Sequence, residues 1–224
     1  MYDYLDALLA KLKKKLQTEF NRLGSMGFDD LNVVNTKKVT KEMFDRQLAE
    51  NEKTYRKAAK NAYSSAKTAA KEAGYKGTET TDVGGEWVLG VLLAYNFVTG
   101  YVYNREAERK RLRLNEQILT AREYNDRQMF NEGLRKVANL FWTQTLQYGI
   151  TVVDEAVLQA YKDMGVEEVR WKAKIDKRTC KVCRERDGKI YKILEVPRKT
   201  HYNCRCYLEP VRAEEWQDAD SGRD

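Results

Sequence analysis

The residues best suited to chemistry lie close together in the last fifth of the sequence. All four cysteines and the single histidine occur in the order Cys180-x-x-Cys183 and then His201-x-x-Cys204-x-Cys206. Two thiolates three positions apart can bind one tetrahedral ion, and a second group of ligands about twenty residues later closes such a site. The spacing therefore predicts a structural zinc site.

We predict that Zn²⁺ is bound by Cys180, Cys183, His201 and Cys204, with Cys206 as the alternative fourth ligand. Four protein ligands leave no open position for an activated water, which argues against metallohydrolase chemistry. The motifs of zinc deaminases, zinc proteases and nucleotide-binding proteins do not occur in the sequence. The competing roles for the cysteines are a disulfide, free buried thiols and a catalytic Cys–His pair.

The elements that position these residues are mainly helical. Only two prolines occur in 224 residues. Apolar residues at three-to-four residue spacing predict a helix over 5–23 that Gly24 ends, and its leucine stripe is suited to packing or to docking a partner. Further helices are expected over 40–73, 86–96, 101–120, 126–147 and 152–164, with a loop over 78–85 and breaks at Gly149 and Gly165.

A change to two-residue alternation at Val169 predicts a β unit. Val169, Trp171, Ala173 and Ile175 should share the buried side of a strand, and Asp187-Gly188 is a hairpin turn signal before 189–193. The predicted fold is mainly α: an elongated multi-helix body with a small C-terminal zinc-stapled β-hairpin module (α+β). The expected parts are an N-terminal amphipathic helix and connector (1–35), a helical domain (36–165), the zinc-binding β module (166–212) and a polar tail (213–224).

The formal net charge of +7 admits a nucleic-acid partner without requiring one. Basic side chains gather around the predicted module, so the alternative function is a zinc-containing, nonspecific nucleic-acid-binding protein. The residues predicted to contact phosphates are Lys172, Lys174, Lys177, Arg178, Lys181 and Arg184. These charges can equally serve solubility or meet an acidic protein. No segment approaches the ~20 apolar residues of a membrane span, and the first residues lack the layout of a signal peptide. We therefore expect folding in a reducing cytoplasm and no membrane partner.

The motif residues resemble the Mu F-like phage head morphogenesis family, the minor head proteins of tailed phages and prophages. The matching residues, in order, are Trp171, Asp176, Arg178, Cys180, Cys183, Gly188, Tyr191, Pro197, His201, Cys204, Arg205 and Cys206. The helical string Trp142-x-Gln-Thr-x-Gln-Tyr148 is also similar to the family, so the resemblance covers roughly residues 85–210. One departure is the single proline before His201, where the family has several.

This resemblance implies a non-enzymatic virion component that associates with the portal protein during procapsid assembly. The scaffold or major capsid protein and DNA are further implied partners. The protein would assist DNA packaging or delivery, residing first in the host cytoplasm and then in the capsid interior near the portal vertex.

Overall fold

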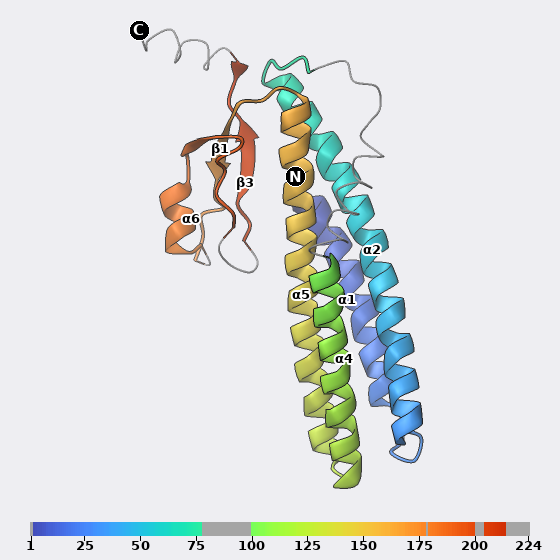
Figure 1. Cartoon of the computed structure of the whole chain (residues 1–224). Coiled ribbons are helices and arrows are strands. Elements are labelled where there is room, and N and C mark those ends of the chain that lie inside the picture. Colours follow the sequence, from blue (N-terminus) through green and yellow to red (C-terminus); the bar gives the residue numbers. More distant parts are fainter. Residues whose placement is uncertain (1, 78–99, 178, 200–203, 214–224) are drawn as a thin grey trace. The chain divides into compact units, whose positions relative to one another are not determined.

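The computed structural model describes residues 2–77, 100–177, 179–199 and 204–213 (Figure 1). Its long helices are α1 (Tyr2–Gly24), α2 (Val33–Glu72), α4 (Gly100–Glu123) and α5 (Arg127–Asp163). The remaining elements are strand β1 (Glu168–Lys172), helix α6 (Lys181–Arg186), and strands β2 (Ile190–Lys192) and β3 (Tyr207–Pro210). The predicted loop over 78–85 and helix over 86–96 lie outside the described residues. None of the described helices is long and apolar enough to span a membrane.

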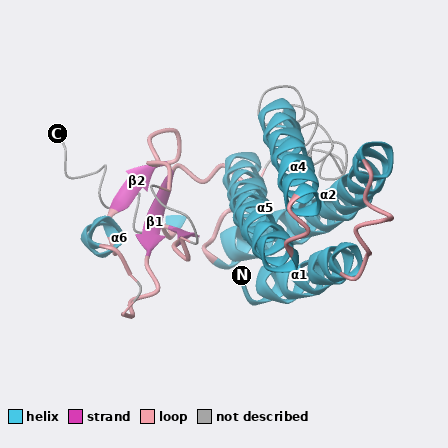
Figure 2. Cartoon of the chain, turned by 90° about the horizontal axis from the view of Figure 1, so that it is seen from below, coloured by secondary structure: helices cyan, strands magenta, loops and turns pink. Residues whose placement is uncertain are grey.

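The described residues form two compact units. The bundle unit contains residues 3–56 and 100–149, that is, α1, α4 and the first parts of α2 and α5. The sheet unit contains residues 57–77 and the described residues from 150 to 213, which include the second parts of α2 and α5 and all three strands. The predicted class, mainly α with a small β part, is confirmed (Figure 2).

The bundle unit is held by an apolar core to which all four of its helices contribute. Phe20 and Leu16 of α1, Phe44 of α2, Ile118 of α4 and Phe141 of α5 are at most 5% exposed. The rings of Phe44 and Phe141 lie 4.9 Å apart between centroids. Burial of this size supplies the main favourable free energy of a helical bundle.

This core corrects one expectation about α1. Its leucine stripe faces inward, and Leu9, Leu12, Leu16 and Leu23 are at most 4% exposed. The stripe was suited to packing or docking, and packing uses these four leucines. Their side chains are therefore buried and not exposed to a partner.

A buried polar layer also joins α2, α4 and α5 in the bundle unit. The hydroxyl of Tyr55 donates to the carbonyl of Thr145 at 2.8 Å, and the amide of Asn51 donates to the hydroxyl of Tyr103. The rings of Tyr103 and Tyr148 stack at 4.5 Å. Burial raises the pKa of Tyr148 to about 12 and also raises the pKa values of Tyr55 and Tyr103. Such a layer favours one alignment of the helices, because any other leaves these polar groups unpaired.

Gly149 does not end a helix, contrary to the predicted break. Helix α5 runs without interruption from Arg127 to Asp163. A Cβ atom at Gly149 would lie only 3.1 Å from Cε1 of Tyr55. Glycine is thus used here for a close approach of a ring to the helix, not for a turn. Gly165, in contrast, has φ of +72° just beyond α5, as a C-terminal helix cap requires.

The sheet unit contains a three-stranded antiparallel sheet in the order β2-β1-β3. In the central strand Val169 and Trp171 are at most 2% exposed, whereas Arg170 and Lys172 are half-buried. The predicted alternation is therefore correct over β1. It fails beyond Lys172, where the strand ends, and Ile175 is 52% exposed.

The connection from β1 to β2 differs from the predicted hairpin. Helix α6 lies between the two strands, so Asp187 and Gly188 join a helix to a strand. Gly188 has φ of +78°, and its N–H donates to the carbonyl of Trp171 at 2.8 Å. Asp187-Gly188 does form a turn that leads into β2. The residue spacing did not predict helix α6 between β1 and this turn.

Within the sheet unit, hydrogen bonds from α5 and from the segment after α2 hold β3 and the residues that follow it. Tyr161 of α5 is fully buried and donates its hydroxyl to the carbonyl of Leu208 in β3 at 3.0 Å. The N–H of Ala213 donates to the carbonyl of Ala73 at 3.1 Å, beyond the end of α2. These bonds tie the sheet to helix ends of the same unit.

Candidate metal centre

Three of the four cysteines form a buried cluster in the sheet unit. Sulfur atoms of Cys183, Cys204 and Cys206 all lie within 4.8 Å of one another, and the Sγ atoms of Cys183 and Cys204 are 3.7 Å apart. Each of these residues is at most 3% exposed. Cys183 comes from α6, and the other two precede β3 at alternate positions. Three soft donors at this separation can bind a thiophilic ion such as Zn²⁺.

Cys180 lies beside the cluster at the start of α6. It is the residue that caps this helix, and its Sγ accepts a hydrogen bond from the N–H of Cys183 at 3.4 Å. Cys180 is half-buried and packs against the other cysteines. The short helix thus gives the Cys-x-x-Cys pair the local turn that a shared metal requires. His201, the fourth predicted donor type, lies outside the described residues.

An ion pair beside the cluster joins the two segments that carry the cysteines. The guanidinium of Arg205, between Cys204 and Cys206, approaches both carboxylate oxygens of Asp176 at 2.6 and 2.7 Å. Asp176 belongs to the turn that leads to Cys180, where its N–H donates to Oγ1 of Thr179 at 2.7 Å. This two-pronged contact joins residues far apart in the sequence. The sequence contained both residues in the motif but gave no sign that they meet.

Trp171 supplies the apolar side of the site. It is 2% exposed and packs in one cluster with Cys183, Cys204 and Cys206. The guanidinium of Arg186 lies 5.2 Å from the centre of the Trp171 ring, on the α6 side of the strand. An apolar wall of this kind excludes water and favours compact thiolate coordination.

The protonation of the three thiols differs strongly from that of free cysteine. A hydrogen bond from Cys206 lowers the pKa of Cys204 to about 5, whereas burial raises the pKa of Cys183 to about 12. The pKa of Cys206 is raised as well, chiefly by its hydrogen bond to Cys204. Without a cation, a buried site of this size cannot hold three negative sulfurs. A divalent metal would supply the charge that lets further thiols ionise, with release of protons.

The donor set fits zinc, because three thiols with a fourth sulfur or an imidazole make a closed tetrahedral structural site. The structure brings together Cys183, Cys204 and Cys206, with Cys180 adjacent. Cys206, the predicted alternative, belongs to the same group as Cys204. The ligand set itself stays a prediction.

The basic residues predicted to contact DNA are partly engaged within the protein. Lys172 and Lys181 each have a glutamate carboxylate within reach, at 3.9 and 3.8 Å. Arg184 donates to the carbonyls of Thr179 and Asp176. Lys174 and Lys177 lie after β1 and form no ion pair with a carboxylate of the described residues, and Arg178 lies outside those residues.

Comparison with family models identifies the part of the chain that builds this site. Residues 108–209 match the family described as Phage Mu protein F like protein. This stretch is a Phage Mu F-like domain. It includes most of α4, all of α5 and α6, and the described cysteines. Comparisons with curated proteins and with solved structures give no match.

The Mu F-like match confirms the family inferred from the motif and indicates a phage head morphogenesis protein. A match to a head protein family implies association with the virion. The domain also contains Thr145 and Tyr148 from the familial helical string, and these residues belong to the buried polar layer. Within the matched stretch, the helical string supplies packing inside the bundle, and the cysteines supply the thiol cluster.

Proposed function

We propose that the protein is a non-enzymatic minor head protein that joins the portal and procapsid during assembly and assists DNA packaging or delivery. The observation that carries this proposal is the Mu F-like match over residues 108–209, the region that also contains the thiol cluster. The protein would be made in the host cytoplasm and then reside inside the capsid near the portal vertex.

In this proposal zinc has a structural role. The donors are Cys183, Cys204 and Cys206, with Cys180 or His201 as the fourth ligand. Support comes from the burial of the three thiols, since a substrate would need an open coordination position and a path from solvent. Zinc would crosslink the segments that precede and follow β2, in place of a larger apolar core.

The surface proposed to meet the portal is the end of the bundle unit between α1 and α2 and between α4 and α5. Val34 is 74% exposed and Tyr124 is 71% exposed. Their connecting segments are adjacent, because the Arg122 side chain donates to the carbonyl of Phe28 at 3.0 Å. Exposed apolar side chains next to a polar rim are typical of protein interfaces.

The test is incorporation of the protein into heads. A phage or prophage that lacks this gene is complemented with the wild-type chain, and procapsids and virions are analysed by mass spectrometry. We expect the chain in both particles and a complex with the portal on co-expression. The double variant Val34→Ser/Tyr124→Ser should lose the complex while keeping its helical circular dichroism.

The matched control is Leu112→Ser/Leu140→Ser, which removes two apolar side chains that are also exposed, on α4 and α5, more than ten residues from the connection between these helices. Absence of the wild-type chain from both particles would overturn the proposed function. Equal portal binding by both double variants would move the contact to another surface.

A further inference from the structure

The second part of α2 carries a row of lysines on one side. Lys57, Lys60, Lys67 and Lys71, here called the lysine face, recur at three, seven and four residues. At 100° and 1.5 Å per residue, these side chains fall within an arc of roughly 80° and a length of about 21 Å. All belong to the sheet unit. Lys57, Lys60 and Lys71 are exposed, and Lys67 is half-buried with its Nζ 5.8 Å from the ring centre of Tyr63.

The opposite side of the same helical segment fixes the direction of these lysines. Ala58, Ala59, Ala62, Ala66 and Ala70 are at most 7% exposed. Because the alanine side is packed, the segment cannot rotate to bury the lysine face without losing those contacts. The charges are thus held in a fixed row on a regular helix.

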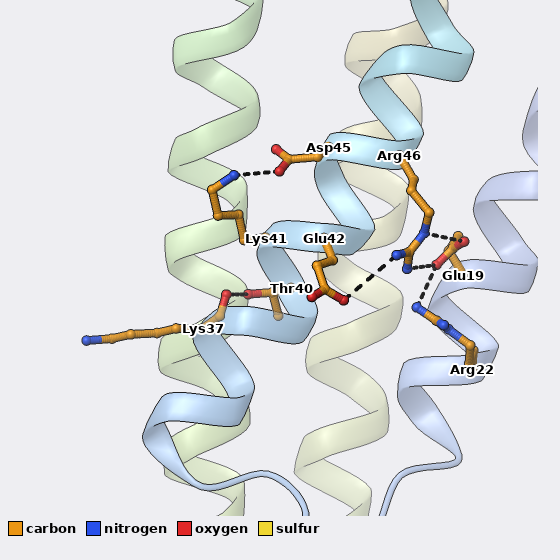
Figure 3. A network of polar contacts seen from close by, with 8 residues as sticks. All are labelled: Glu19, Arg22, Lys37, Thr40, Lys41, Glu42, Asp45 and Arg46. Carbon is orange, nitrogen blue, oxygen red and sulfur yellow. Dashed lines mark hydrogen bonds and ion pairs between the residues drawn. The ribbon is translucent and has the colours of Figure 1, made fainter.

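In the described part of the chain the lysine face has no carboxylate in an ion pair with it, unlike the first part of the same helix. There, Arg46 pairs with Glu19 and Glu42, and Lys41 pairs with Asp45 (Figure 3). Between residues 57 and 76 the only acidic residue is Glu72. None of the four lysines forms an ion pair with a carboxylate among the described residues.

The composition of the lysine face favours a polyanion over a protein as its partner. Lysine is depleted in the centres of protein interfaces, which rely on aromatic and other large apolar side chains. No described residue from 57 to 77 is an exposed large hydrophobic. A row of point charges, in contrast, suits phosphates, since each neutralised phosphate releases condensed counterions.

We propose that the lysine face binds the phosphate backbone of duplex DNA without sequence preference. The inference rests on the proposed function only for the source of the DNA, which is the genome packaged in the head. It also moves the predicted DNA contact from the strand lysines to α2. Lys172 and Lys181 have glutamate partners, whereas the lysine face has none among the described residues.

The test compares two variants of equal charge in the full chain. Lys57→Gln/Lys60→Gln/Lys67→Gln/Lys71→Gln removes the lysine face. The control Lys11→Gln/Lys14→Gln/Lys37→Gln/Lys38→Gln removes four other exposed lysines. Affinity for a duplex of mixed sequence is measured at several salt concentrations. With a log–log slope of about −0.9 per phosphate contact, the first variant should bind with a slope shallower by roughly 3 to 4. The control and Lys172→Gln/Lys174→Gln should keep the wild-type slope.

Equal slopes for wild type and the lysine-face variant would overturn the inference, and so would the same loss in the control. If the variant does not fold, amine-selective modification of the wild-type chain gives the answer, because bound duplex should protect the four lysines from labelling. Unprotected lysines would then contradict the inference. A variant that binds DNA normally but no longer enters heads would assign the lysine face to an acidic protein. Incorporation into heads is measured in a separate experiment. Failure of the proposed function and failure of the DNA-binding inference therefore give different results.

Discussion

The bundle unit and the sheet unit are stabilised in different ways. In the bundle unit, long helices bury aromatic and leucine side chains such as Phe20, Phe44 and Phe141. In the sheet unit, strands of five, three and four residues enclose Trp171 and the cysteine cluster. Strands this short bury little apolar surface by themselves. The comparison teaches that the cysteine cluster and contacts with the helices of the same unit supplement strands that are too short to build a core alone.

The strongest test of this contrast is loss of the metal ligands. Cys183→Ser and Cys204→Ser should each abolish tight zinc binding and unfold the sheet, because structural zinc contributes on the order of 10 kcal/mol to small modules. Metal analysis should find one zinc per wild-type chain and far less in either variant. Amide hydrogen exchange should become fast in β1 and stay slow in the bundle part of α5.

Val182→Ser is the matched control, since Val182 lies in α6 beside Cys183 but is 38% exposed. It should keep full zinc content. Two disulfides in place of zinc in the wild-type chain would refute the metal centre. Simultaneous loss of protection in both units would refute their separate stabilisation.

A smaller effect, in the bundle unit instead of the sheet unit, is expected from Phe141→Ala. Removing this ring from the bundle core should cost about 3–5 kcal/mol of unfolding free energy. The denaturation midpoint of the helices should fall, while zinc content should not change. Leu140→Ala, one residue earlier and 41% exposed, is the control and should shift the midpoint little. Zinc loss from Phe141→Ala under native conditions would indicate that the bundle supports the metal centre.

The smallest effect is expected from Arg205→Gln, which tests what the ion pair with Asp176 contributes to the sheet unit. The pair with Asp176 is about one-third exposed on each side, so its direct contribution to stability should be at most about 1 kcal/mol. Its loss should act through ligand positioning and weaken zinc affinity by about tenfold. Competition with a zinc chelator measures this. Lys181→Gln, which breaks an exposed pair on α6, should leave affinity unchanged.

The sequence predicted what local spacing encodes. Glycine and apolar periodicity placed the ends of α1 and α5 within a few residues, and alternation identified β1 through Val169 and Trp171. The cysteine cluster followed from spacing as well, because the ligands of structural zinc sites typically occur in close pairs. In each of these cases the information lies in neighbouring residues.

What escaped prediction depends mostly on residues far apart in the chain. Gly149 looked like a break because its reason, the ring of Tyr55, lies on another helix. The inward direction of the leucines of α1 and the contact of Arg205 with Asp176 were hidden in the same way. The start of α2 at Val33, earlier than predicted, differs from these, because Asn32 caps the helix by accepting from the N–H of Asn35. That signal is local and can be recognised in the sequence.

The strand order has a consequence for the time at which the protein matures. The central strand β1 needs β3 as a neighbour, and Cys204 and Cys206 immediately precede β3. All residues of the bundle unit are synthesised before these. On a ribosome, therefore, the helices of the bundle unit can assemble before β3 is available to pair with β1. Cys180 and Cys183 are likewise made before Cys204 and Cys206. Any metal bound by the full cysteine cluster would then be captured after the helices of the bundle unit have been made, and a translation product truncated before Cys204 would be helical but would lack two of the clustered thiols.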